Sequence, residues 1–152
     1  MKKNKIKHSV SPLLLLILLI GTFTNPLRAD NPPPSIFKIF EKYGNNKGVT
    51  MLEVSKELMK NYKIKHFKSI VFEDGRTALP EIRECIKKDR ANAIKMKELI
   101  QNGEIISAYY RLKSNDKIIN RYLIFKVGEN YKTTLIYIEG ELTPEELIEI
   151  LK

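Results

Sequence analysis

Cysteine, histidine and tryptophan are scarce in this chain of 152 residues, which has one cysteine, two histidines and no tryptophan. A single cysteine cannot form an internal disulfide, so a disulfide-stapled scaffold is excluded. A zinc site needs several nitrogen or sulfur ligands at short spacings, and Cys85 with His66 does not provide them. We therefore predict a domain without a metal or another cofactor.

Motifs that carry catalysis are absent as well. No serine lies in a Gly-x-Ser-x-Gly setting, and residues 44–48 lack the Gly-Lys-Ser/Thr ending of a phosphate-binding loop. Cys85 lies in a helical pattern of apolar residues, which indicates burial as a small hydrophobe rather than a reactive thiol. An enzyme would require His66 to lie in a cleft beside Cys85 or a carboxylate. We predict that the protein is not an enzyme.

Only one long apolar run occurs, and it lies close to the N-terminus. Leu13–Ile20 is a run of eight aliphatic residues, preceded by four lysines and followed by the small residue Ala29. This is the layout of a secretory signal peptide, and the run is shorter than the roughly 20 apolar residues that span a bilayer. We predict export to the periplasm, with the cell surface or secretion as alternatives. After cleavage the protein is not expected to be an integral membrane protein.

Much of the excess positive charge of the chain lies in this predicted signal peptide. The chain has 27 Lys+Arg and 18 Asp+Glu, a net charge of +9, and residues 1–29 hold five of the basic residues and no acid. The remainder carries 22 − 18 = +4, which is ordinary for a small soluble domain. Neither this charge nor export favours a nucleic-acid partner. We divide the chain into a signal peptide (1–29), a proline-rich spacer (30–34) and a single domain (35–152).

Helical patterns occur in three regions. Ser35 is suited to cap a short helix that ends at Gly44, and Thr143 to cap a final helix with Pro144 in its first turn. Between residues 77 and 102, apolar residues recur at spacings of three, four and seven, which is typical of an amphipathic helix. A polar stretch near Asp89 predicts that this region is divided into two helices.

Three runs rich in β-forming residues fill the last third of the chain, at 104–113, 118–127 and 132–139. Short turns separate them, so an antiparallel meander is expected. Residues 49–54 and 67–72 are candidates for a fourth and a fifth strand. We predict an α+β fold in which this meander of three main strands packs against helices.

Four stretches of the chain carry a resemblance to known proteins: IFKIFEKY at 36–43, GVTMLEVS at 48–55, NRYLIFKV at 120–127 and TLIYIEG at 134–140. Together they cover much of the domain. The chain resembles small exported bacterial proteins of a domain-of-unknown-function family that is common in Gram-negative anaerobes. The resemblance implies a signal peptide and a compact α+β domain. It brings no activity, substrate or site residue.

Tyrosines on the predicted strands suggest one candidate surface. Because side chains alternate along a strand, we assign five residues to the sheet face that points away from the helices: Tyr109, Tyr122, Ile124, Leu135 and Tyr137. Exposed apolar patches with tyrosines mark binding sites. The alternative is that the N-terminal helix, with Phe37 and Phe40, covers this face.

A second candidate surface is a basic stripe on the helical region 77–102, formed by Arg83, Lys87, Arg90 and Lys97. It would suit an acidic partner, or it is simply a solvated helix face. From these observations we predict an exported, non-enzymatic domain that acts by binding another protein or by self-association. The alternative is a domain that binds a glycan or lipid of the cell envelope.

Overall fold

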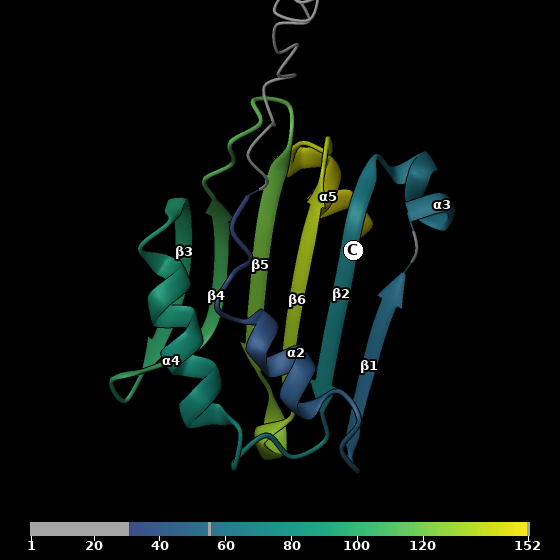
Figure 1. Cartoon of the computed structure of the whole chain (residues 1–152). Coiled ribbons are helices and arrows are strands. Elements are labelled where there is room, and N and C mark those ends of the chain that lie inside the picture. The colour runs from purple at the N-terminus through teal and green to yellow at the C-terminus, as the bar shows by residue number, and fades with distance from the viewer. Residues whose placement is uncertain (1–30, 55, 152) are drawn as a thin grey trace, which may run out of the picture.

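The computed structural model describes residues 31–54 and 56–151, so the predicted signal peptide lies outside the described residues. The fold is one antiparallel sheet of six strands with the spatial order β1-β2-β6-β5-β4-β3 (Figure 1). The strands are β1 (Val49–Val54), β2 (Ile64–Phe72), β3 (Ala93–Gln101), β4 (Glu104–Leu112), β5 (Asn120–Val127) and β6 (Thr133–Gly140). The α+β class is confirmed, but the predicted three-stranded meander is only half of the sheet.

One element was assigned to the wrong class. Residues 93–101 were expected to form a second helix and instead form the edge strand β3, paired with β4. The Asn102-Gly103 dipeptide decides this, because both residues have positive φ, 51° and 77°, and make the two-residue turn of a β-hairpin. Their pairing partners Gln101 and Glu104 lie directly opposite each other. A helical spacing of apolar residues was outweighed by turn chemistry at its end.

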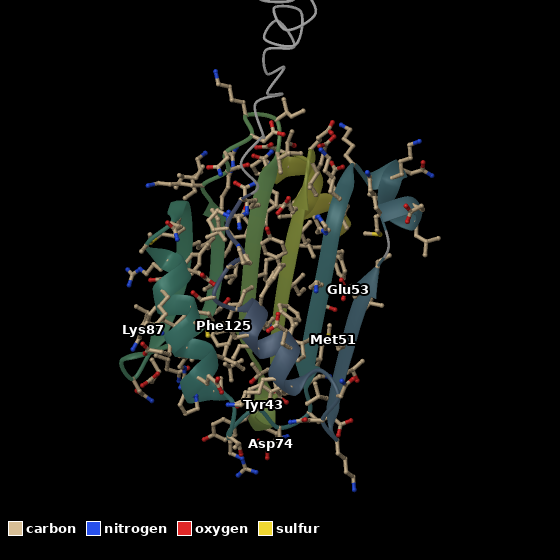
Figure 2. All side chains as sticks on the ribbon, viewed as in Figure 1. Tyr43, Met51, Glu53, Asp74, Lys87 and Phe125 are labelled. Carbon is tan, nitrogen blue, oxygen red and sulfur yellow. The ribbon has the colours of Figure 1, made fainter. Side chains whose placement is uncertain are left out.

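Two helices cover one face of the sheet (Figure 1), namely α2 (Phe37–Tyr43) and α4 (Leu79–Arg90). Their apolar sides bury the main core against the strands, and Figure 2 shows Phe125 of β5 beside these two helices. Cys85 of α4 belongs to this core and is 6% exposed, which confirms its predicted burial. We call this side the covered face.

The short helix α5 (Pro144–Ile150) lies on the opposite face near one end of the sheet (Figure 1). Thr143 caps it as predicted: the Thr143 hydroxyl accepts from the Glu146 N–H, and the Glu146 carboxylate accepts from the Thr143 N–H. Leu147 points inward and forms a second apolar cluster with Leu142, Ile64, Tyr122 and Ile138. The remaining short elements are α3 (Lys56–Met59), η1 (Lys60–Tyr62) and η2 (Glu129–Tyr131).

The start of α2 is held by a carboxylate from α4. Ser35 was expected to cap this helix, but the cap position falls on Ile36, whose side chain has no acceptor. Asp89 instead accepts hydrogen bonds from the backbone N–H groups of Ser35 (2.6 Å) and Ile36 (3.0 Å). Asp89 is 4% exposed. Burial raises its pKa, an effect that these backbone hydrogen bonds oppose.

Replacing Asp89 by alanine should destabilise the fold strongly. The substitution leaves the buried N–H of Ile36 and the partly buried N–H of Ser35 unpaired, each costing up to about 1–3 kcal/mol, so we expect a loss of about 2–4 kcal/mol in the free energy of unfolding. Urea denaturation followed by circular dichroism measures this loss. Lys87→Ala, an exposed position on the same helix, is the control. A loss below about 1 kcal/mol for Asp89→Ala would contradict the capping role.

Candidate functional site: the open sheet face

The five residues predicted to share one face lie on both sides of the sheet. Residues paired directly across antiparallel strands point to the same side. Tyr109 pairs with Ile124, so these two share a face, and Tyr122 joins them two residues along β5. Tyr137 pairs with Leu123 and lies on the covered face. Leu135, two residues before it on β6, lies there as well.

The assignment of Leu135 and Tyr137 to an exposed surface is therefore wrong. They are 0% and 1% exposed, and the Tyr137 ring packs edge-on against Phe37 of α2 at 4.9 Å between centroids. The error arose because β6 is apolar on both of its faces, so its alternation does not reveal which side is buried. The N-terminal helix does cover tyrosine, as the alternative reading held, but on the opposite face from Tyr109 and Tyr122.

Tyr122 is buried although it lies on the face away from α2 and α4. Helix α5 and its preceding loop cover it, and the Tyr122 hydroxyl donates to the Leu142 carbonyl oxygen at 3.0 Å. Burial is the main reason that the pKa of Tyr122 is raised from 10.0 to about 12, and the neighbouring Tyr109, with ring centroids 6.0 Å apart, adds to the shift. Tyr122 is thus a core residue rather than a contact residue.

The cover that α5 provides is short. Its seven residues make a helix about 10 Å long, whereas the eight residues of β5 extend about 27 Å. In the described part of the chain, the strand segments beyond α5 carry no helix on this side (Figure 1). We call this uncovered area the open face.

An apolar row crosses the open face. The paired residues that form it, one from each strand, are Leu52, Ser69, Ile136, Ile124, Tyr109 and Lys97. Leu52 is 51% exposed, while Ile124, Ile136 and Tyr109 are half-buried. An antiparallel sheet that faces water normally presents polar residues on that side. This partly exposed apolar row is the candidate contact surface of the domain.

Basic and acidic side chains of the open face come from different elements, the strands and helix α5. Its charged strand positions are all basic within the described residues: Lys95, Lys97, Arg111 and Lys126. Acidic side chains enter this side from α5, where Glu145 and Glu149 are exposed and lie four residues apart, on the helix side opposite Leu147. The face therefore has a basic region on β3, β4 and β5, while α5 contributes acidic side chains, of which Glu146 is paired with Lys63 at 2.6 Å.

The predicted basic stripe is not a continuous surface. Arg83 is ion-paired with Glu104 at 3.1 Å, and Arg90 with Glu98 at 3.3 Å. Lys97 belongs to strand β3 and faces the other side of the sheet from α4. The stripe depended on the helix that residues 93–101 do not form, and its two arginines act as links between α4 and the β3-β4 hairpin.

The hypothetical thiol–imidazole pair does not form, and His66 instead lines a cavity together with the carboxylates of Asp116 and Glu139. Cys85 is buried under α4, and desolvation raises the pKa of its thiol, which disfavours the reactive thiolate. His66 is exposed on β2, whereas α4 packs beside β3 and β4 at the other end of the strand order. Within the described residues, no cluster of three or more His, Cys, Asp or Glu side chains could hold a metal ion.

The alkaline stability of the fold should depend on Tyr122. The Tyr122 side chain has a pKa near 10 in the unfolded chain and about 12 in the folded one. Its contribution to the free energy of unfolding is therefore complete below pH 10 and is lost progressively between pH 10 and pH 12. Tyr122→Phe should cost about 1 kcal/mol at neutral pH through the lost hydrogen bond and should make the fall in stability from pH 10 to 12 shallower. Urea titrations across this range measure both effects, and parallel curves for the two proteins would contradict the assignment.

Comparison with known proteins places the chain in a family whose function is unknown. A family model described as a family of unknown function, DUF6108, matches residues 31–151, which is nearly the whole described domain. The chain therefore belongs to this family. No curated protein and no solved structure matches the chain. In the described residues, no helix is long and apolar enough to cross a membrane.

Proposed function

We propose that this member of the DUF6108 family is an exported, non-enzymatic domain that acts by self-association, with the open face as its contact surface. The observation that carries the proposal is the apolar row from Leu52 to Tyr109, which the helices of the described chain cover only in part. Export rests on the lysines, the apolar run Leu13–Ile20 and Ala29 at the start of the sequence.

A second copy of the chain fits the shape of this surface. Helix α5 stands out from one end of the face, and the remainder lies lower by the thickness of a helix. A two-fold axis in the interface, perpendicular to the strands, brings the α5 of each copy over the uncovered strands of the other. Two-fold interfaces are self-complementary by construction, and they close after two subunits.

Charge supports the same arrangement. In a dimer with this two-fold axis, Glu145 and Glu149 on α5 of one copy would lie near Lys126 of the other copy, at the end of β5 that is remote from its own α5. Beside these acids, Ile148 is 55% exposed and Ile150 is 41% exposed. Both apolar side chains would meet the apolar row of the second copy and lose their contact with water. Burial of such side chains contributes affinity, while the opposite charges set the register of the two copies.

A charge-reversal experiment tests this proposal. Lys126→Glu should weaken dimerisation about tenfold at low salt, because Lys126 would face two glutamates. Combining it with Glu149→Lys should restore association, since the pair keeps opposite signs. Sedimentation velocity over a concentration series gives the dimer dissociation constant for each protein. Lys132→Ala, at an exposed position outside the sheet, is the control.

Two results would overturn the proposal. A wild-type protein that keeps the monomer mass at all concentrations would exclude self-association. A dimer that is unaffected by Lys126→Glu, and equally by Ile124→Ser in the apolar row, would place the interface elsewhere. Circular dichroism of each variant shows whether the fold is retained, so that a loss of association can be assigned to the surface.

A further inference from the structure

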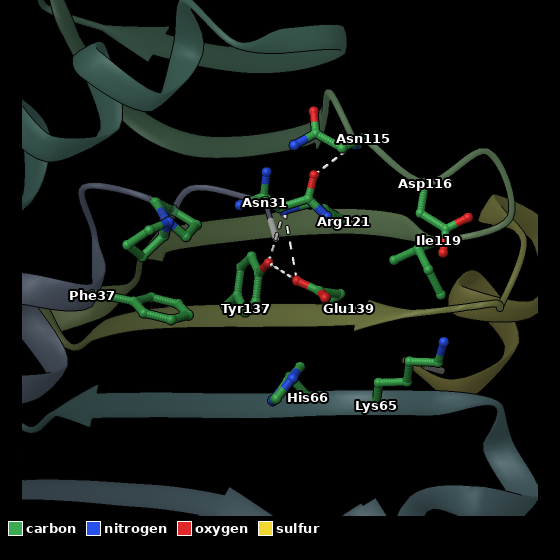
Figure 3. Close-up of a pocket in the computed structure, with 12 residues that line it drawn as sticks. Asn31, Phe37, Lys65, His66, Asn115, Asp116, Ile119, Arg121, Tyr137 and Glu139 are labelled. Carbon is green, nitrogen blue, oxygen red and sulfur yellow. Dashed lines mark hydrogen bonds and ion pairs between the residues drawn. The ribbon is translucent and has the colours of Figure 1, made fainter. Parts of the chain in front are cut away.

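A cavity of about 470 Å³ lies on the covered face, where α2 does not reach the ends of β2, β5 and β6 (Figure 3). One wall is the N-terminal segment that includes Asn31 and Pro33, and another is the loop between β4 and β5 with Asn115. Sites for small ligands usually have volumes of about 300–1,000 Å³. This cavity is on the other side of the sheet from the open face, so what it binds is independent of the proposed self-association.

A buried arginine fixes the shape of the cavity. The Arg121 side chain is 5% exposed and donates three hydrogen bonds: to the Tyr137 hydroxyl (3.0 Å), to the Lys113 carbonyl (3.0 Å) and to the Pro32 carbonyl (2.7 Å). It thereby joins β5, β6, the β4-β5 loop and the N-terminal segment. Tyr137 in turn donates to Glu139 at 2.5 Å (Figure 3). A wall held in this way needs little rearrangement to receive a ligand, which favours binding.

The charges around the cavity balance. Its lining contains two basic residues, Lys65 and Arg121, and two acidic residues, Asp116 and Glu139. An anionic ligand would lie close to the carboxylates, and a cationic ligand would lie close to the amine and the guanidinium. Both would meet repulsion in a partly desolvated site. The lining therefore favours a ligand without net charge.

The remaining lining combines apolar surface with hydrogen-bonding groups. Phe37, Ile119 and the prolines at positions 33 and 34 provide the apolar part, while Asn31, His66 and Asn115 provide groups that can donate or accept. A ligand that suits both must have apolar patches and hydroxyl groups close together. Sugars have this character, because their C–H faces pack on apolar surfaces and their hydroxyls both donate and accept.

From these observations we propose that the cavity binds a neutral saccharide, with His66 and Asn115 as hydrogen-bonding residues and Phe37 as the apolar platform. The rigid Arg121–Tyr137–Glu139 group positions the wall of the site. The cavity lining includes Tyr137 and His66, which the sequence suggested for a binding face and for catalysis, respectively.

The test is an NMR titration of the ¹⁵N-labelled protein with four neutral disaccharides: maltose, cellobiose, mannobiose and diacetylchitobiose. At least one should shift the amide signals of residues at the cavity, such as His66 and Asn115, and leave those of the open face unchanged. His66→Ala should weaken that sugar about tenfold, the loss expected for one hydrogen bond. Lys132→Ala, which is exposed and remote from the cavity lining, should bind like the wild type.

The charged sugars galacturonic acid and glucosamine complete the experiment. If only a charged sugar shifts the cavity signals, the cavity does not prefer a neutral ligand and the proposal is wrong. If none of the four neutral sugars shifts them, or if His66→Ala binds as tightly as the wild type, the proposed site is wrong. Shifts confined to the open face would assign sugar binding to the other surface and would also overturn it.

Discussion

The shortage of helix relative to sheet is the constraint on which the rest of this structure depends. Six antiparallel strands have two broad faces, and α2 and α4 bury the larger part of one of them. Among the described helices, the other face has only the seven-residue α5 and the four-residue α3, whose Met59 packs against the same apolar cluster as Leu147. The length of α5 is about a third of the length of a strand. The apolar row from Leu52 to Tyr109 remains partly exposed as a result. This exposure is the reason for proposing the open face as a contact surface.

Two buried polar side chains hold the N-terminal segment against the domain. Asp89 binds the backbone at the start of α2, and Arg121 binds the Pro32 carbonyl. Buried charged groups are tolerated when their hydrogen-bonding capacity is used. Residues 31–34, which by composition are a spacer, thereby become one wall of the cavity beside Tyr137. The segment thus contributes to a site that its own sequence does not suggest.

Prediction from the sequence succeeded where local signals agreed and failed where they competed. The capping box at Thr143 and the burial of Cys85 followed from local patterns and are present. Residues 93–101 carried helical spacing, but the Asn102-Gly103 turn and pairing with β4 made them a strand. For β6, apolar residues on both faces left the side of Leu135 and Tyr137 undetermined. Arg121 gave no signal, because an isolated arginine in a strand is ordinarily exposed.

The sequence by itself determined the α+β class, the positions of most strands, the end of α2 at Gly44 and the start of α5 at Thr143, because these depend on alternation, turns and caps within a few residues. It also carried the resemblance to a family of unknown function, and the family match confirmed that part of the resemblance. Only the tertiary structure decided which tyrosines are buried, which sheet face stays open and where a cavity forms. Those outcomes depend on the order of the strands and on contacts such as Asp89 with Ser35, which join positions 54 residues apart. Local patterns do not encode such pairings, since several registers bury a similar apolar area.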